Sequence, residues 1–131
     1  MTQVEDGSVA SIRFRLAPAD ARYAGGLVAG SKILEVFADL ETELSLLEGG
    51  DEGLCAGYDK VEFLAPLHVG DYVEATGRVV ARGRSSRLVE CEIRRVISVD
   101  ERGCRVPGDE PVLLARATVT IVVGKTAGVP A

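Results

Sequence analysis

Three acidic residues, Glu35, Asp39 and Glu43, recur at four-residue intervals within the stretch Ala21–Leu54. Four-residue spacing stacks side chains on one face of a helix, where like charges repel by roughly 0.2–0.5 kcal/mol per pair. A column of carboxylates kept despite this repulsion indicates acid–base chemistry, because carboxylates can take, hold and release protons. The alternative is a solvated helix face whose acids pair with arginines of a strand.

A glycine-rich loop, GGLVAGS, precedes these acids and contains Gly25, Gly26 and Gly30. If a helix begins after the loop, its first turn offers N–H groups without intrahelical partners and a partial positive charge. Glycines let a ligand approach such a backbone closely, so the loop could polarise a carbonyl group as an oxyanion hole does. The alternative is a plain glycine turn without a ligand, and the loop matches neither a dinucleotide-binding nor a P-loop pattern.

The composition describes one acidic domain with an aliphatic core. The chain has 131 residues, of which 47% are hydrophobic and only 5% aromatic, so small and branched aliphatic side chains must fill the core. A net charge of −5 argues against nucleic-acid binding, which needs a basic stripe to neutralise phosphates. No apolar run approaches the roughly 18 residues needed to cross a bilayer, and the N-terminus has no signal-peptide pattern.

The cysteines and the single histidine limit which disulfide and metal sites the chain can form. Cys55, Cys91 and Cys104 are widely spaced, and their odd number suits a reducing cytoplasm rather than a disulfide framework. His68 is the only histidine and there is no CxxC motif, so a His-Cys metal site is not expected. We expect His68 to be a surface turn residue, and we expect no bound metal or cofactor.

The hydrophobic pattern predicts one strand, one long helix and then four strands. Ser11–Leu16 alternates as a short strand, and from Ser31, the expected N-cap, a 3.6-residue period predicts a helix of about five turns that stops at Gly49 and Gly50. The expected buried face of the helix comprises Ile33, Val36, Phe37, Leu40, Leu44 and Leu47. The four later strands are expected at Tyr58–Pro66, Tyr72–Gly83, Leu88–Asp100 and Val112–Val123, with loose ends at residues 1–10 and 124–131.

These elements predict a single α+β domain, residues 1–131, in which an antiparallel β-sheet wraps around one long central helix. Short connections force neighbouring strands to run antiparallel. A helix with a single apolar stripe can be covered by one face of such a sheet. Exposed sheet edges then favour pairing with a second copy of the chain.

The stretch VEFLAPLHVGDYVEATGRVVARGRSS resembles the signature region of hotdog-fold acyl-CoA proteins. It has a strand ending in Pro, a Gly-Asp turn, a second strand and then Gly-x-Ser-Ser. The resemblance covers nearly the whole chain and implies a hotdog fold, a homodimer or higher homo-oligomer such as a dimer of dimers or trimer of dimers, and sites at the subunit interface. This stretch alone identifies the superfamily and not the reaction.

Five shorter motifs, YAGGLV, LEVFADLETEL, GDEGL, YDKVEFLAPL and GDYVEA, resemble the 3-aminobutyryl-CoA and β-alanyl-CoA ammonia-lyases. This resemblance implies a carbon–nitrogen lyase that eliminates ammonia from a short β-aminoacyl-CoA to give an enoyl-CoA, with coenzyme A present only as part of the substrate. An acyl-CoA thioesterase on the same scaffold is the alternative, and a non-catalytic acyl-CoA-binding module is a third interpretation.

The helix departs from two other hotdog patterns. Many hotdog thioesterases carry Gly-Gly-x-Leu-Leu-x-x-x-Asp, whereas here Ile33 and Leu34 take the Leu-Leu place and Ala38 takes the acid position. Asp39 follows one residue late, rotated by about 100°. Hotdog hydratases use an Asp and His pair on this helix, which here has no His. Both departures weaken the hydrolase and hydratase interpretations.

Ammonia elimination needs a base for the α-proton, a stabilised enolate oxygen and a group that holds the β-ammonium. Carboxylates suit the first and third tasks, so we expect Asp39 or Glu43 to be the base and Asp51 or Glu52 of the following turn to hold the ammonium. The alternative for the two turn acids is a solvated cap. The resemblance implies substrate-binding roles for Tyr23, Gly25, Gly26 and Glu62, and Gly30 of the same glycine-rich loop is expected to join them.

The turn RGRSSR gathers three cations and two hydroxyls, namely Arg82, Arg84, Ser85, Ser86 and Arg87. In an acidic protein this local cluster suits the phosphates of coenzyme A. The alternative is an ordinary charged hairpin.

Overall fold

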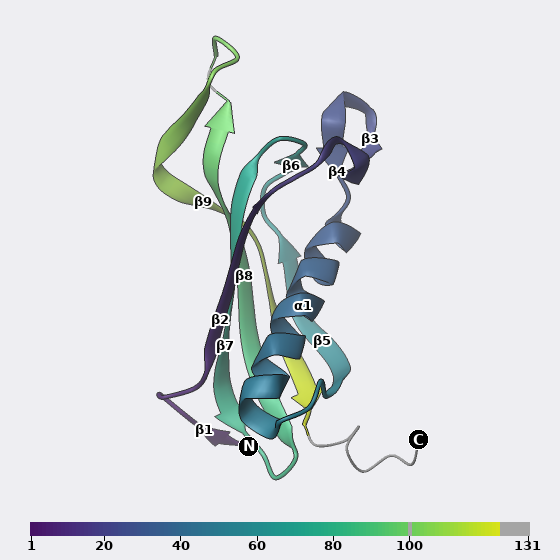
Figure 1. The fold of residues 1–131 in the computed structure, drawn as a ribbon, viewed down its shortest axis with the longest axis vertical. Coiled ribbons are helices and arrows are strands. Elements are labelled where there is room, and N and C mark those ends of the chain that lie inside the picture. The colour runs from purple at the N-terminus through teal and green to yellow at the C-terminus, as the bar shows by residue number, and fades with distance from the viewer. Residues whose placement is uncertain (100, 124–131) are drawn as a thin grey trace.

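The computed structural model describes residues 1–99 and 101–123 (Figure 1). The larger sheet contains β1 (Thr2–Gln3), β2 (Val9–Arg15), β5 (Leu54–Phe63), β7 (Tyr72–Arg82), β8 (Ser86–Val99) and β9 (Arg105–Val122). The smaller sheet contains β3 (Ala21–Tyr23), β4 (Leu27–Val28) and β6 (Leu67–His68). The helical elements are α1 (Gly30–Gly49) and the short 3-10 helices η1 (Pro18–Asp20) and η2 (Ala24–Gly26).

The larger sheet is antiparallel throughout its described pairings. Its strand order is β1–β7–β8–β9–β5, with β2 also paired to β7. Short turns join β7 to β8 and β8 to β9, and α1 runs along one face of the curved sheet (Figure 1). The predicted fold, an antiparallel sheet wrapped around one long helix, is therefore confirmed.

The apolar stripe of α1 forms the centre of the core. Its fully or nearly fully buried hydrophobic residues are Ile33, Val36, Phe37, Leu40 and Leu44. They pack on inward-facing aliphatic residues of β7, β8 and β9, and Gly77 allows the closest approach, because a Cβ there would lie 3.1 Å from Leu44 Cδ1. Leu47 was expected on the same buried face, but it is 61% exposed.

The predicted end of the helix is confirmed, whereas its predicted start lies two residues too late in the sequence. Gly50 has a φ of 80° and its N–H donates to the Leu46 carbonyl, so it terminates α1 as expected. The N-cap position is Ala29 and not Ser31, and no side chain caps it. The reason is that β4 ends at Val28, which leaves Ala29 as the last extended residue before the helix.

Several strands extend beyond their predicted bounds. Residues 1–10 were expected to be loose, but Thr2–Gln3 and the start of β2 pair with β7. β5 begins at Leu54 because β9 continues to Val122 and offers it a partner. The predicted loop after β8 is instead a continuation of the β8–β9 hairpin, with Ile97 opposite Pro107. Residues 124–131, the expected loose tail, lie outside the described residues.

Among the described helices, none has the length and apolar character needed to span a membrane.

Candidate active site

An apolar cavity of about 210 Å³ lies at the start of α1. Its lining residues are Leu27, Val28, Gly30, Ile33, Phe63, Ala65, Pro66 and Leu67. The turn before it contains Gly25 and Gly26, whose φ values of 75° and 74° glycine adopts without strain. This turn directs β4 along the start of the helix, so two of the three predicted loop glycines shape the cavity wall and the third lines it.

Gly30 brings the aromatic ring of Phe63 against the first residue of the helix. A Cβ at this position would lie 2.9 Å from Phe63 Cε1 and Cζ, which is closer than a side chain tolerates. The first N–H groups of a helix have no intrahelical acceptor and carry a partial positive charge. The cavity therefore has apolar walls next to the start of the helix, an arrangement that suits a short acyl chain.

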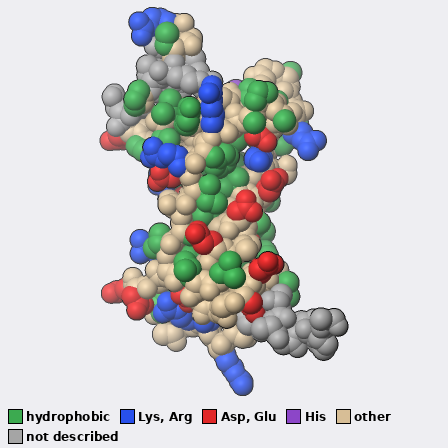
Figure 2. All heavy atoms as spheres, viewed as in Figure 1, with side chains coloured by type: hydrophobic (Ala, Val, Ile, Leu, Met, Phe, Trp, Pro, Cys, Tyr) green, Lys and Arg blue, Asp and Glu red, His purple; other side chains and the backbone are tan. Residues whose placement is uncertain are grey.

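The predicted acid column faces away from the sheet. Glu35, Asp39 and Glu43 are all exposed in this chain, and acidic side chains follow the outer face of α1 (Figure 2). Neither Asp39 nor Glu43 lines the cavity at the start of the helix. Their predicted roles as base stay predictions, and the chain alone does not bring them to the apolar cavity.

A different acid of α1, Glu41, is buried between the helix and β5. It is 4% exposed, and the Tyr58 hydroxyl lies 3.4 Å from its Oε2 and 3.3 Å from the Leu34 carbonyl oxygen. Burial raises the pKa of the Glu41 carboxyl to about 7, against smaller lowering effects of hydrogen bonds from Cys55 and Tyr58. Burial also raises the pKa of Tyr58, which keeps its hydroxyl protonated as a donor.

A carboxyl group with a pKa near neutrality can act as a general base or acid. Glu41 fits this role because burial raises the pKa of its carboxyl to near neutrality. Cys55 and Tyr58 belong to β5, an edge strand of the larger sheet, so Glu41 lies one layer of side chains below the surface. A substrate that reaches β5 is therefore close to it.

The sequence carried a signal for Glu41 that the search for an acid column missed. Glu41 follows Phe37 by four residues and precedes Leu44 by three, so it lies beside the apolar stripe and on its buried side. An acid inside a buried helix stripe is rare unless it has a partner or a function.

The turn after α1 lies at the opposite end of the helix from the apolar cavity. Asp51 Oδ1 accepts a hydrogen bond of 2.9 Å from the Gly53 N–H, which is the turn-closing contact expected of an aspartate there, and Glu52 is exposed. A helix of 20 residues spans about 30 Å. Asp51 and Glu52 therefore cannot hold a group bound in the cavity of their own chain.

Two arginines of the predicted phosphate-binding turn bind a carboxylate of α1 instead. Glu48 Oε1 accepts from Arg82 Nε at 2.6 Å and from Arg87 Nε at 2.8 Å, and Ser8 donates to Oε2 at 2.7 Å. These contacts lower the pKa of Glu48 to about 2, the Arg82 hydrogen bond most of all. The cluster thus ties the end of α1 to the β7–β8 hairpin.

The rest of that turn faces solvent. Arg84 and Ser85 are exposed, and the Ser85 and Ser86 carbonyl oxygens accept hydrogen bonds from the N–H groups of Val123 and Gly83. Coenzyme A binding by this turn stays a prediction, with Arg84 as its exposed cation.

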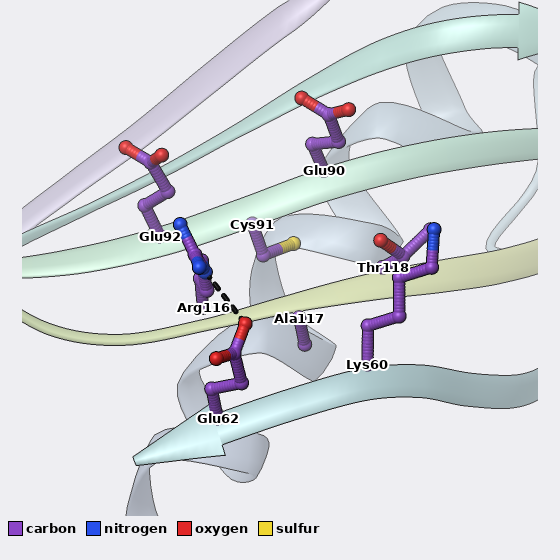
Figure 3. Close-up of a pocket in the computed structure, with 8 residues that line it drawn as sticks. All are labelled: Lys60, Glu62, Glu90, Cys91, Glu92, Arg116, Ala117 and Thr118. Carbon is purple, nitrogen blue, oxygen red and sulfur yellow. Dashed lines mark hydrogen bonds and ion pairs between the residues drawn. The ribbon is translucent and has the colours of Figure 1, made fainter. Parts of the chain in front are cut away.

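Glu62 lies on the outer face of the larger sheet, away from α1. Its Oε1 accepts a 2.8 Å hydrogen bond from Arg116 Nε, within a charged depression of about 300 Å³ that also includes Lys60, Glu90 and Glu92 (Figure 3). The structure therefore does not bring Glu62 to the apolar cavity. Tyr23, another predicted contact, is 59% exposed on β3, and His68 is exposed as expected.

Comparisons with known proteins agree with this architecture. Residues 26–99 match the model of a family described as the thioesterase superfamily. The chain is 41% identical over 118 residues, covering 87% of this chain and 93% of the relative, to the 3-aminobutyryl-CoA ammonia lyase of Acetoanaerobium sticklandii.

Two solved structures are also similar. The β-alanyl-CoA:ammonia lyase from Clostridium propionicum is 30% identical with a TM-score of 0.85, over 92% of this chain and 87% of that one. A hexameric hotdog-fold thioesterase of Campylobacter jejuni is 25% identical with a TM-score of 0.73, over 85% of this chain and 79% of that one. The chain therefore belongs to the thioesterase superfamily of hotdog-fold proteins, and within it to the family of the aminoacyl-CoA ammonia lyases.

Proposed function

We propose that this protein eliminates ammonia from a short 3-aminoacyl-CoA thioester of the 3-aminobutyryl-CoA type and, in reverse, adds ammonia to the enoyl-CoA. The observation that carries this proposal is Glu41, a buried carboxyl on α1 with a pKa near 7 in a chain 41% identical to an ammonia lyase. The reaction needs such a base, because the proton next to a thioester carbonyl is only weakly acidic.

The proposed mechanism uses two groups of the chain. Main-chain N–H groups at the start of α1, beside Gly30, polarise the thioester carbonyl and stabilise the enolate oxygen. The Glu41 carboxylate takes a proton from C2, the C3–N bond breaks with its electron pair leaving on nitrogen, and the C2–C3 double bond forms. The released ammonia then takes the proton from Glu41 and leaves as ammonium, which returns the carboxylate to its starting form.

These two groups do not meet within one chain. Glu41 follows Gly30 by eleven residues, which corresponds to about 16 Å of helix. Antiparallel pairing of two β5 edges would place a second α1, running in the opposite direction, beside the first. We therefore propose a homodimer joined along β5, assembled further as in the hexameric relative from Campylobacter jejuni. Exposed Leu54, Phe63 and Leu64 on and beside β5 support this interface.

Mixed oligomers test whether the site is shared between chains. A Glu41→Gln chain has an intact cavity but no base, and a Gly30→Val chain has the base but a blocked cavity. Each variant alone is therefore expected to be inactive. If the partner subunit's Glu41 serves the cavity, refolding the two variants together restores part of the activity, because half of the sites in each heterodimer then contain both groups. If both groups act within one chain, mixing restores nothing.

The other predicted contacts keep narrower proposed roles. Arg84, Ser85 and Ser86 would meet the phosphates of coenzyme A as it leaves the cavity of the partner subunit. Asp39, Glu43, Asp51 and Glu52 would assist in holding the ammonium only where a partner covers them. Coenzyme A enters as part of the substrate; the absence of a further cofactor and the cytoplasmic location stay predictions.

One assay separates the lyase from the thioesterase alternative. The protein is incubated with crotonyl-CoA and ammonium, and separately with butyryl-CoA. Loss of enoyl absorbance that depends on ammonium and releases no free thiol supports the lyase. Thiol release from both thioesters supports a hydrolase, and binding without either reaction supports an acyl-CoA-binding module.

Replacing Gly30 with Ala is expected to raise the KM for crotonyl-CoA about tenfold or more. The new Cβ would lie 2.9 Å from the Phe63 ring, so the ring must shift, which changes the wall of the cavity that we propose receives the acyl group. A shift of about 1.4 kcal/mol in binding corresponds to this factor. Steady-state kinetics against crotonyl-CoA concentration provide the measurement.

Ser31→Ala is the control for that variant, because it changes the next residue of α1, which is exposed and does not line the cavity. Its KM is expected to stay at the wild-type value. An unchanged KM in the Gly30 variant would show that the cavity at the start of α1 does not receive the acyl chain.

A further inference from the structure

Ser45 is a second buried polar group on α1, one turn beyond Glu41. Its side chain is 0% exposed, and its Oγ has no hydrogen-bond partner among the described residues. Glu41 Oε1 is likewise buried without a partner among the described residues, since Tyr58 contacts Oε2. Buried polar atoms are nearly always hydrogen-bonded, so two neighbouring exceptions on one helix face indicate a missing guest.

The chain is shaped to admit the Ser45 hydroxyl. Gly53, with a φ of 65°, lies directly against it, and a Cβ at Gly53 would be 2.1 Å from Ser45 Oγ. Gly53 therefore leaves room for the Ser45 hydroxyl, which any larger residue at position 53 would displace. Aliphatic residues would fill this position in an ordinary helix stripe, as Leu40 and Leu44 do beside it.

The two side chains lie four residues apart on α1, so one small molecule between them can contact both. Side chains four residues apart on a helix have Cβ atoms about 5–6 Å apart. A carboxylate oxygen accepts only, and a hydroxyl oxygen accepts readily, so the pair favours a guest rich in N–H donors.

We propose that Glu41 Oε1 and Ser45 Oγ together hold the ammonia or ammonium that the reaction releases or consumes. This assignment rests on the proposed lyase function and adds to it the group that recognises nitrogen. Ammonium can donate to both oxygens at once, and its positive charge is attracted to the Glu41 carboxylate, whereas a water molecule carries no charge. The same contact places the nitrogen beside the carboxyl that exchanges a proton with it.

Ser45→Ala is expected to raise the KM for ammonium about tenfold in the addition reaction with crotonyl-CoA. The KM for crotonyl-CoA and the rate at saturating ammonium are expected to stay within about threefold of wild type, since Ser45 contacts neither the acyl chain nor C2. Thr42→Ala is the matched control, because it removes an exposed hydroxyl from the same helix and is expected to change neither constant.

Ser45→Cys provides a second variant of nearly the same size, whose weakly accepting sulfur is also expected to raise the ammonium KM. An unchanged ammonium KM in both folded Ser45 variants would overturn the proposal and leave Ser45 as the ligand of a buried water. Equal rises in the KM values for ammonium and crotonyl-CoA would overturn it too, since they indicate a general distortion. A wild-type protein that adds no ammonia to crotonyl-CoA would overturn the proposed function itself.

Discussion

Replacing Glu41 with Gln is expected to lower the rate of ammonia elimination by about 10²–10⁴-fold, the range that a positioned general base contributes. Gln has nearly the same shape and can still contact Tyr58, but its amide cannot take the proton from C2. The KM for the thioester is expected to change much less than kcat, because the cavity at the start of α1 binds the acyl group. Steady-state kinetics of the purified variant provide the measurement.

Glu35→Gln is the matched control, since it makes the same chemical change on the exposed face of the same helix. It is expected to keep wild-type turnover. The turnover of Tyr58→Phe is expected to lie between those of Glu41→Gln and Glu35→Gln, because this change removes the hydroxyl that orients Glu41 Oε2. If Glu41→Gln keeps full turnover while Asp39→Asn or Glu43→Gln loses it, the exposed acids are the catalytic ones.

The Glu41→Gln change is also expected to alter the free energy of unfolding, in a direction that the pKa of Glu41 determines. The carboxyl pKa is about 7 in the folded chain against an ordinary value of 4.5, so between these pH values the folded chain binds more protons than the unfolded chain. Stability contributed by this group therefore falls as pH rises from about 4.5 through 7. Glu41→Gln is expected to raise the free energy of unfolding by up to about 3 kcal/mol at pH 8 and by little near pH 4.

The same titration governs activity in the opposite direction. Only the carboxylate form can take the C2 proton, so kcat/KM for elimination is expected to rise with pH and to level off above about pH 7. A variant that loses activity while gaining stability at pH 8 cannot have failed through unfolding. Thermal melts at several pH values, run beside the rate measurements, check both expectations.

Replacing Glu48 with Ala is expected to lower the free energy of unfolding by about 2–3 kcal/mol. Its side chain is only 6% exposed and accepts from Arg82, Arg87 and Ser8, so its loss leaves two guanidinium groups without their carboxylate. Breaking a buried ion pair removes about 3–5 kcal/mol, and the 32% exposure of Arg82 lets water recover part of this. Thermal or urea unfolding measures the change, with a Tm shift of roughly 10 °C.

The pH dependence of this contribution follows from the same contacts. The pKa of Glu48 is lowered to about 2 from its ordinary value of 4.5, so its stabilising effect is complete above about pH 4.5 and is lost as pH falls toward 2. The difference between wild type and Glu48→Ala is therefore expected to shrink over that range. Glu35→Ala, which removes an exposed acid from the same helix, is expected to leave the Tm nearly unchanged. Equal Tm values for Glu48→Ala and wild type at pH 7 would contradict a stabilising role of Glu48.

The fold was predictable because its long elements carry local patterns, whereas the short strands β1, β3, β4 and β6 were not predicted. The apolar spacing from Ile33 to Leu44 specifies a helix with one buried stripe, and Gly50 supplies the left-handed residue that ends it. The strands follow from alternating patterns between turn residues. The bounds of β5 and β9 were missed because they depend on the partner strand, which no local pattern contains.

The candidate site was only partly predictable. The glycine turn before α1 was predicted, since a positive φ and close packing leave few other residue types, and its role in substrate binding stays a prediction. Glu41 was missed because charge spacing drew attention to the exposed column, whereas burial depends on where β5 lies relative to the helix. Arg82 and Arg87 were assigned to a ligand because sequence alone could not show that Glu48, from a distant element, lies beside them.

The most direct test is the addition of ammonium to crotonyl-CoA in D2O, with deuterium at C2 of the product followed by NMR and mass spectrometry. With wild-type protein, one deuterium is expected at C2, delivered from the Glu41 carboxyl at a rate that depends on its titration near pH 7. With folded Glu41→Gln protein, neither product nor C2 deuteration is expected above the uncatalysed level. Wild-type rates of C2 deuteration in that variant would contradict the assignment of Glu41 as the base.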